Sequence, residues 1–591
     1  MLKKVMETDD EELILGKIDT EDLLLLNVLY HRPTKERGWN DYASVLLKNV
    51  STGEKQVVLI QNPRMILYEV KEECRDYNYT PAYREKKDTI PHKIAYKDVI
   101  KEIEKIAGEQ GHEFIQRCNN SKNYSAKKNI HKYPYVLATD YDYPSLFRIN
   151  WLMYYANPDI KVELTKMYLD IEVDSIDVPG FPTPDICPIN AVSIVDPTGS
   201  TVYEFMLNNP ENKQIGEFMD NIESFKQECK DKFNSVYGDF EYKFILFEEE
   251  IDMLRELFKL INRLKRDFCL IWNMRFDIPY IINRIKVLGY DPSEIMCPDD
   301  VAIKECYYKK DMMHFDFKTR NDAFFFNSYT VFLDQMAQYI KIRKSRSEIK
   351  SVKLNNIAKS EIGDEKLDYS EDANIKTLPY VDYHKFILYN IKDSLLLLGI
   401  ENRTNDIDNV FHRASQFATP YNLIFSQTRL LKNHAYDSYM QQGFVIGNNR
   451  NVDYSNYSDP DDEKNLKEKF EGALVGDPLL NSRIGAMIFN QKSKFVFLKC
   501  VDFDFSSMYP YVKIAHNIGH ETMIGKIQFD SKYNIQDVFP NATEEEDDGL
   551  RDNGKDFAEA ILSRDYAYIG SRFLSLPSVE EIESKLMSKF K

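Results

Sequence analysis

The stretch that decides the fold runs from Lys166 to Val173 and reads KMYLDIEV. Its apolar and aromatic residues predict a β-strand. Because side chains alternate between the two faces of a strand, Asp170 and Glu172 leave it on the same face. Two adjacent carboxylates repel each other unless a cation lies between them, so the pair suits Mg²⁺ or Mn²⁺. Alone, the pair is weak evidence, since a solvated strand end accounts for it equally well.

Strand and helix patterns alternate around this stretch. We expect strands over 191–195, 202–207 and 268–272, and helices over 250–264, 277–287 and 383–401. Such alternation predicts an α/β layer with a central sheet.

Two more groups of polar residues belong to this layer. After the predicted strand over 268–272, Asp277 occupies the N-cap position of a helix and Pro279 lies in its first turn. Farther along the chain, Tyr389 and Asp393 stand four residues apart in a predicted helix and therefore share a face. Each group alone has a plain structural explanation, a helix cap for the first and two surface residues for the second.

Together the groups indicate a two-metal site. One strand and two helices supply four carboxylates: Asp170, Glu172, Asp277 and Asp393. Such a site needs two ions about 4 Å apart, one generating hydroxide and the other stabilising the leaving oxygen. Tyr389 would orient the attacking water. Asn273 would hold a terminal nucleotide by hydrogen bonding, and Phe276 would hold it by stacking.

The three motifs, in this order, resemble the Exo I (DxE), Exo II (Nx2-3FD) and Exo III (Yx3D) motifs of the 3′–5′ proofreading exonuclease domain of family B DNA polymerases. Their surroundings LDIEVDS, IWNMRFDIPYIINRI, LNNIAKSEIGDEKLDY and YNIKDSLLL are similar to polymerases of tailed bacteriophages. The resemblance implies an RNase H-like exonuclease domain, a central mixed β-sheet flanked by helices. It also implies two Mg²⁺ or Mn²⁺ ions and hydrolysis of the 3′-terminal phosphodiester of DNA.

A second resemblance lies downstream, at FEGALV (470–475). It is similar to the Y-x-G-G/A element, with Phe in place of Tyr. In the family this element lies between the exonuclease and polymerase modules and touches the template. The resemblance implies DNA contacts at Gly472 and Ala473.

A third resemblance, VDFDFSSMYP (501–510), is to polymerase motif A, DxxSLYP. It implies a strand that delivers Asp504 as a catalytic metal ligand. Residues of the following turn would bind the dNTP: Phe505, Ser506, Ser507, Met508 and Tyr509. Among these, the backbone N–H groups would receive the triphosphate, and Tyr509 would exclude a 2′-hydroxyl.

Polymerisation in this family also needs motif C (DTDS) and the lysine of motif B (Kx3NSxYG). The chain contains no DTD. A string that matches motif B, KDKFNSVYG, occurs at 230–238, but it lies between the first two exonuclease motifs, so we interpret it as a turn of that domain. One polymerase carboxylate cannot assemble two-metal nucleotidyl transfer. We therefore expect a second polymerase chain that supplies motifs B and C.

The resemblance implies a multidomain protein of α/β and α+β character. We expect an α+β N-terminal domain over 1–160 and the exonuclease domain over 161–405. A helical return to the N-terminal domain and a linker would occupy 406–465, and the first part of the polymerase palm, with an insertion, would occupy 466–591. Expected partners are primer-template DNA with a single-stranded 3′ end, dNTP, the second polymerase chain, a sliding clamp and other replisome proteins.

Composition narrows the class of protein. Across 591 residues, 43% hydrophobic and 13% aromatic content exclude wholesale disorder. No apolar run approaches the ~18 residues that span a bilayer, and the N-terminus turns acidic before a signal peptide develops. Eight scattered cysteines without a CxxC pair favour reduced thiols. We expect a protein without membrane association, in the cytoplasm of an infected bacterial host. Its net charge of −18 fits carboxylates gathered for metals.

Two alternatives remain open from the sequence. The chain would be a stand-alone 3′–5′ DNA exonuclease if no polymerase partner exists. It would be a non-catalytic DNA-binding module if its sites had decayed, although the presence of all four exonuclease acids speaks against that.

Overall fold

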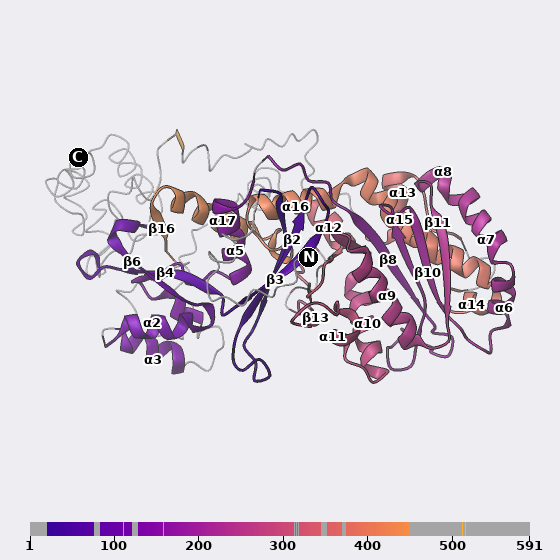
Figure 1. Cartoon of the computed structure of the whole chain (residues 1–591), viewed down its shortest axis with the longest axis horizontal. Coiled ribbons are helices and arrows are strands. Elements are labelled where there is room, and N and C mark those ends of the chain that lie inside the picture. The colour runs from indigo at the N-terminus through magenta and orange to yellow at the C-terminus, as the bar shows by residue number, and fades with distance from the viewer. Residues whose placement is uncertain are drawn as a thin grey trace, which may run out of the picture. The chain divides into compact units, whose positions relative to one another are not determined.

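The computed structural model describes residues 21–75, 83–109, 111–120, 128–157, 159–312, 314, 316, 318–343, 351–368 and 374–447, together with 511, 514 and 515. The chain divides into two compact units, 1–467 and 468–591. Almost all described residues belong to the first unit, whose helices and strands are labelled in Figure 1.

A mixed six-stranded sheet forms the centre of the region that holds the predicted acids. Its strands, in spatial order, are β11 (Glu241–Phe247), β10 (Thr201–Leu207), β9 (Ile189–Asp196), β8 (Lys166–Val173), β12 (Phe268–Ile271) and β15 (Val331–Asp334). β9 runs antiparallel to both β8 and β10. The pairs β10–β11, β8–β12 and β12–β15 are parallel. The predicted α/β character of this region is confirmed.

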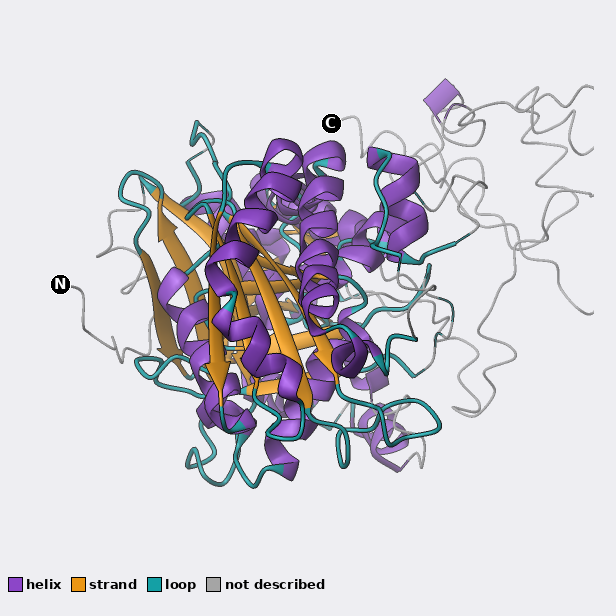
Figure 2. Ribbon diagram, turned by 90° about the vertical axis from the view of Figure 1, so that its right-hand side faces the viewer, coloured by secondary structure: helices purple, strands orange, loops and turns teal. Residues whose placement is uncertain are grey.

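Helices cover both faces of the sheet (Figure 2). The first face packs against α9 (Glu250–Leu264), α10 (Met274–Val287) and α11 (Pro292–Met296). The second packs against α6 (Lys213–Asp220), α7 (Ile222–Cys229), α12 (Gln335–Ile342), α13 (Leu354–Ile362), α15 (Tyr383–Thr404) and α16 (Asp406–Gln416). Both faces are therefore buried in hydrophobic cores.

The alternation along β8 decides which face carries the acids. Met167, Leu169 and Ile171 belong to the core with α9 and α10. Tyr168 belongs to the core with α15. Asp170 is two residues from Tyr168, so it shares that residue's face. The two carboxylates of β8 therefore lie on the face of the sheet that α15 covers.

The N-terminal region is built from small antiparallel sheets. One has the order β1 (Leu23–His31), β2 (Tyr42–Asn49), β3 (Lys55–Gln61), and another β6 (Thr89–Ala95), β4 (Arg64–Val70), β7 (Val136–Leu137). The accompanying helices are α2 (Val99–Ala107), α3 (His112–Asn120) and α5 (Tyr143–Tyr154). After α16 the chain returns through α17 (Gln427–Gln441), and β16 (Phe444–Ile446) pairs with β5 (Tyr83–Glu85).

Most of the predicted elements are confirmed, several with their bounds. The strand expected over 166–173 is β8 and the helix expected over 250–264 is α9. The helix expected from Asp277 was wrong in its start, because α10 begins at Met274. Asn273 adopts a left-handed conformation, with φ 65°, and its carbonyl accepts the Phe276 N–H at 2.9 Å. The chain thus turns directly from β12 into the helix, and Asp277 lies inside the helix rather than at its cap.

The segment 230–238 also differs from its prediction. It was expected as a turn, but a π-helix (η5, Lys230–Asn234) and a short α-helix (α8, Ser235–Tyr237) occupy it. The chain turns only at Gly238, whose φ of 119° suits a residue without a side chain. The segment lies between β10 and β11 of the six-stranded sheet.

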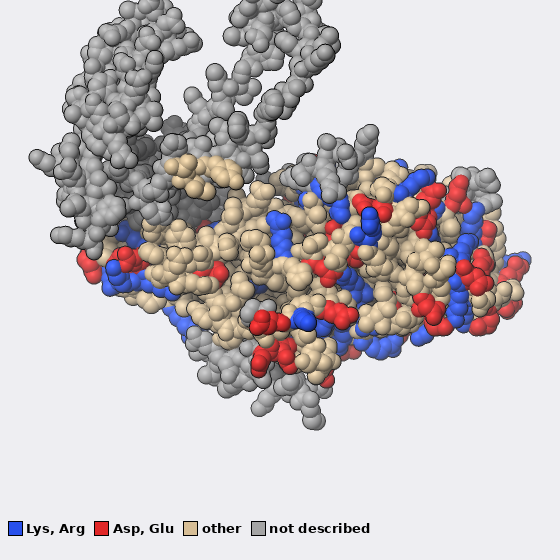
Figure 3. All heavy atoms as spheres, turned by 90° about the horizontal axis from the view of Figure 1, so that it is seen from above, with Lys and Arg blue, Asp and Glu red and all other residues tan. Residues whose placement is uncertain are grey.

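Charges of both signs share the surface. In Figure 3, Lys and Arg lie among Asp and Glu over the described part of the visible face. Some of these charges are paired, for example Arg275 with Asp322 and Arg343 with Asp406, each at 2.7 Å. Among the described helices, none is both long and apolar enough to cross a bilayer.

A buried aspartate joins the N-terminal sheet to the central sheet. Asp267, directly before β12, accepts hydrogen bonds from Lys48 Nζ at 2.7 Å and from the Thr165 N–H at 2.7 Å. Its other oxygen lies 2.8 Å from Lys55 Nζ. Because β2 and β3 supply the two lysines, the carboxylate holds the two sheets together.

Removing this carboxylate is expected to destabilise the protein. Asp267→Ala leaves two buried ammonium groups without their partner, so we expect the free energy of unfolding to fall by about 3–5 kcal/mol. Denaturant titration measures this change. Asp299→Ala is the control, because the Asp299 side chain is 94% exposed and 3.6 Å from its lysine partner. Equal unfolding midpoints for the two variants would contradict the role of Asp267.

Candidate metal centre

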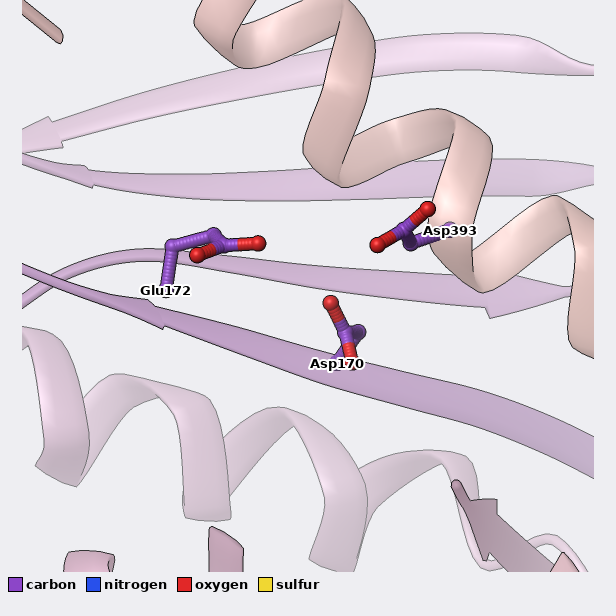
Figure 4. Close-up of side chains that lie close together, drawn as sticks. All are labelled: Asp170, Glu172 and Asp393. Atoms are coloured by element: carbon purple, nitrogen blue, oxygen red, sulfur yellow. The ribbon is translucent and has the colours of Figure 1, made fainter. Parts of the chain in front are cut away.

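Three of the predicted acids meet in space. Asp170, Glu172 and Asp393 each offer a carboxylate oxygen, and these oxygens lie within 4.8 Å of one another. Figure 4 shows that the two acids of β8 and the acid of α15 point toward one another. The alternation of β8 brings Asp170 and Glu172 to one face, and the packing of α15 on that face brings Asp393 to them.

The cluster is crowded with negative charge. Burial, together with the Asp393 carboxylate, raises the pKa of Asp170 to about 7, while Lys366 opposes the shift. Burial and the two aspartates raise the pKa of Glu172 well above its ordinary value. Burial also raises the pKa of Asp393, which is 2% exposed. These three carboxyls therefore lose their protons at higher pH than ordinary carboxyls do.

Asp277 lies near this cluster but outside it. It is 4% exposed, and burial raises the pKa of its carboxyl well above the ordinary value. The charges of Asp170 and Glu172 add to this shift, so the group is within electrostatic reach of both. Its carboxylate is not among those within 4.8 Å of one another. The structure therefore gathers three of the four predicted acids tightly and places the fourth beside them.

Tyr389 and Asp393 share a helix face, as predicted. Lys366 Nζ donates a hydrogen bond to Tyr389 Oη at 2.8 Å, and it also donates one to Asp393 Oδ2. One ammonium group thus contacts both residues of the third motif. Burial and the Asp393 carboxylate raise the pKa of the Tyr389 phenol, so Tyr389 stays protonated at neutral pH.

Lys366 is a residue that the sequence reasoning missed. Burial alone would lower the pKa of its ammonium, but Asp393, Tyr389 and Asp170 more than offset that effect and raise it above the ordinary value. Lys366 is therefore a permanent cation beside the acids. It lies in LNNIAKSEIGDEKLDY, yet nothing in that stretch separates it from the other basic residues of the chain. Only the fold after α13 brings it to the site.

An aromatic pair lies next to the second motif. Phe276 precedes Asp277 on α10, and its ring contacts Phe181 with centroids 5.4 Å apart and planes at 81°. Phe181 is 75% exposed, in a loop between β8 and β9. Asn273, the other predicted nucleotide contact, is partly exposed at the start of α10. The only sequence signal for Phe181 was its position between Gly180 and Pro182.

The donor set fits a hard divalent cation. All three clustered groups are carboxylates, the ligands that Mg²⁺ and Mn²⁺ prefer. Asp393 Oδ1 is buried and makes no hydrogen bond to any described residue. A buried carboxylate oxygen without a partner is costly unless a cation or water satisfies it. Asp170, Glu172 and Asp393 are thus the residues that could hold a metal, and Asp277 interacts electrostatically with the first two.

The predicted polymerase residues cannot be placed, because they lie outside the described part of the chain: Gly472, Ala473, Asp504, Phe505, Ser506, Ser507, Met508 and Tyr509.

Comparison with known proteins agrees with the resemblance of the motifs. Residues 116–357 match the family model described as "DNA polymerase family B, exonuclease domain". The matched range includes Asp170, Glu172 and Asp277, whereas Lys366, Tyr389 and Asp393 follow it.

The curated relatives include phage and eukaryotic enzymes. The DNA-directed DNA polymerase of Escherichia phage RB69 is 25% identical over 400 residues, 64% of this chain and 38% of the relative. That of Enterobacteria phage T4 is 25% identical over 288 residues, 48% of this chain and 27% of the relative. The DNA polymerase delta catalytic subunit of Candida albicans is 22% identical over 286 residues, 47% and 24% respectively. The chain spans less than two fifths of the length of these relatives.

The raised pKa values predict pH-dependent metal binding. Below pH 7 a proton competes for Asp170, whose pKa is about 7 without metal, and above pH 7 the carboxylate is free to bind. We expect Mn²⁺ to bind at least about tenfold more weakly at pH 6 than at pH 8, because the proton on Asp170 must be displaced at the lower pH and the raised pKa of Glu172 adds to the competition. Calorimetric titration of the intact chain measures both the affinity and the proton release.

The matched control is Asp252→Ala, which removes an exposed aspartate of α9 that is paired with Arg255. This variant is expected to keep the tenfold difference, whereas Asp170→Asn should bind weakly at both pH values. An equal affinity of the unaltered chain at pH 6 and pH 8 would contradict the assignment.

Proposed function

We propose that this chain, which carries the exonuclease domain of a family B DNA polymerase, hydrolyses the 3′-terminal phosphodiester of DNA with two divalent metal ions and so proofreads DNA synthesis. The observation that carries the proposal is the cluster of Asp170, Glu172 and Asp393, in which a buried Asp393 oxygen has no hydrogen-bond partner among the described residues. Asp277 completes the set of acids from its place on α10.

The acids would hold the metals, and other residues would place the substrate. Bound divalent ions supply a water of lowered pKa and a positive charge beside the phosphate. Tyr389, a protonated phenol beside Asp393, can donate a hydrogen bond to the attacking water or to a phosphate oxygen. Negative charge builds up on the phosphate oxygens in the transition state of hydrolysis. Lys366 adds a fixed positive charge beside them.

The aromatic pair suits the end of a DNA strand. A base can stack on Phe276, and the exposed Phe181 ring enlarges the apolar surface beside it. Base stacking of this kind tolerates any sequence, since every base has a flat aromatic face. Asn273 can add a hydrogen bond to the terminal nucleotide. A single-stranded 3′ end of any sequence is therefore the substrate that we propose.

We also propose that the segments 470–475 and 501–510 belong to a polymerase palm. Support comes from their order after the exonuclease motifs and from the relatives, which are DNA-directed DNA polymerases. Asp504 would supply one metal ligand there. No DTD occurs in the 591 residues, so motifs B and C would come from outside this sequence, as on a second chain.

The nuclease proposal is tested with a single-stranded oligonucleotide, labelled at its 5′ end and incubated with the chain and Mg²⁺. We expect stepwise shortening from the 3′ end. Asp170→Ala and Asp393→Ala should each lower the rate by at least about 100-fold, because a lost ligand removes metal and charge stabilisation together. Asp252→Ala, on the exposed side of α9, should retain full activity. Shortening that survives the loss of either ligand would refute the proposal.

The palm proposal is tested by primer extension with the chain and a polypeptide that supplies motifs B and C. We expect Asp504→Ala to abolish extension while nuclease activity remains. Asp170→Ala should do the reverse, because the two sites use different carboxylates. Extension of primers by the 591-residue chain alone would show that the missing acids are not needed from elsewhere.

A further inference from the structure

Two crossed ion pairs join α15 to the segment that carries Lys366. We call residues 363–368, which follow α13, the strap. Lys366 of the strap binds Asp393 of α15, and the preceding helix residue, Lys392, binds Asp364 of the strap at 2.5 Å. Neighbouring residues of a helix point in different directions, so the two pairs fix the strap at two separate places.

Tyr237 adds a third element to the second pair. Its hydroxyl donates a hydrogen bond to Asp364 Oδ2 at 2.5 Å and accepts one from Lys392 Nζ at 3.1 Å. Tyr237 ends α8, and its side chain and that of Lys392 are both buried. The motif-B-like segment 230–238 thus contacts the strap and α15 through its tyrosine, and Lys392 directly precedes Asp393 on α15.

The packing around Tyr237 leaves little room for movement. A Cβ on Gly399 would lie 2.8 Å from Ile362 Cδ1 and 3.0 Å from Tyr237 Cε1. The absence of a side chain at Gly399 is therefore what lets the Tyr237 ring and the end of α13 lie against α15. At the other side of the strap, Asn355 Oδ1 accepts the Lys366 N–H at 2.7 Å. The backbone that carries Lys366 is held from both sides.

From this geometry we infer that Tyr237, Asp364 and Lys392 form a positioning clamp for Lys366, whose ammonium the clamp holds against Asp393 and Tyr389. The inference rests on the proposed exonuclease function and deepens it. It gives the segment 230–238 a role inside the nuclease, through a contact with the strap. Tyr237 is a positioning residue, because it acts through Asp364 and Lys366 and touches neither the acids nor Tyr389 in the contacts that the structure gives.

The clamp predicts how metal binding responds to mutation. An ammonium held on Asp393 competes with a metal for that carboxylate, so Lys366→Met should bind Mn²⁺ more tightly. Tyr237→Phe removes the hydrogen bond to Asp364 and the one from Lys392 and so loosens the strap, and it should also tighten Mn²⁺ binding, by about fivefold. In the Lys366→Met background, Tyr237→Phe should have no further effect, because the group that it positions is gone.

The same double-mutant cycle, which combines Tyr237→Phe with Lys366→Met, applies to catalysis. Tyr237→Phe should lower kcat about tenfold with KM for DNA unchanged, since a small displacement of a charged group lowers the rate more than binding. Again it should have no effect beyond that of Lys366→Met. Asp364→Asn, which weakens the hydrogen bond from Tyr237 and the ion pair with Lys392, serves as a second variant. Tyr242→Phe is the matched control, because the Tyr242 hydroxyl donates to Asn234 in the same region at 3.1 Å without touching the strap.

The outcomes separate the clamp from the proposed function. Non-additive effects in both cycles support the clamp. Additive effects would overturn it. The same holds if Tyr237→Phe and Asp364→Asn have the same Mn²⁺ affinity and kcat as the control Tyr242→Phe. If the unaltered chain has no nuclease activity but the Mn²⁺ cycle is non-additive, the clamp stands and the proposed function fails.

Discussion

Electrostatic repulsion among acids is the constraint on which the rest of this structure depends. Three carboxylates with oxygens within 4.8 Å of one another, one of them almost fully buried, cannot all carry charge without a cation between them. Lys366 offsets part of this repulsion, because its ammonium group pairs with Asp393. Protons on Asp170 and Glu172 would relieve the remainder, as their raised pKa values indicate. A divalent ion would do the same, and would release those protons as it binds.

The fold holds this unfavourable arrangement in place. β8 carries two of the acids and is hydrogen-bonded on both sides, to β9 and to β12. α15 carries the third and is buried along most of its length. Neither element can move its acid away without breaking the core on one face of the sheet. The stability of that core is what keeps three like charges close enough to share a metal.

The parts of the site that follow from local periodicity could be predicted from the sequence. Alternation along a strand put Asp170 and Glu172 on one face, and a spacing of four put Tyr389 beside Asp393. The start of α10 could not be predicted in the same way, because it depends on a left-handed Asn273 where a cap at Asp277 fitted the usual rules. The sequence also did not predict the roles of Lys366, Phe181 and Tyr237, for another reason. Each lies on a loop or at a helix end, and only tertiary packing brings Lys366 and Phe181 to the site and Tyr237 to the strap beside it.

The most direct test of this account is a crystal of the intact chain soaked in Mn²⁺ and measured at a wavelength where manganese scatters anomalously. The account predicts an anomalous peak within about 2.5 Å of carboxylate oxygens of Asp170 and Asp393, with the Lys366 ammonium no longer on the oxygen that the metal takes. A map with Lys366 still bound to Asp393 and no manganese among the three acids would contradict it.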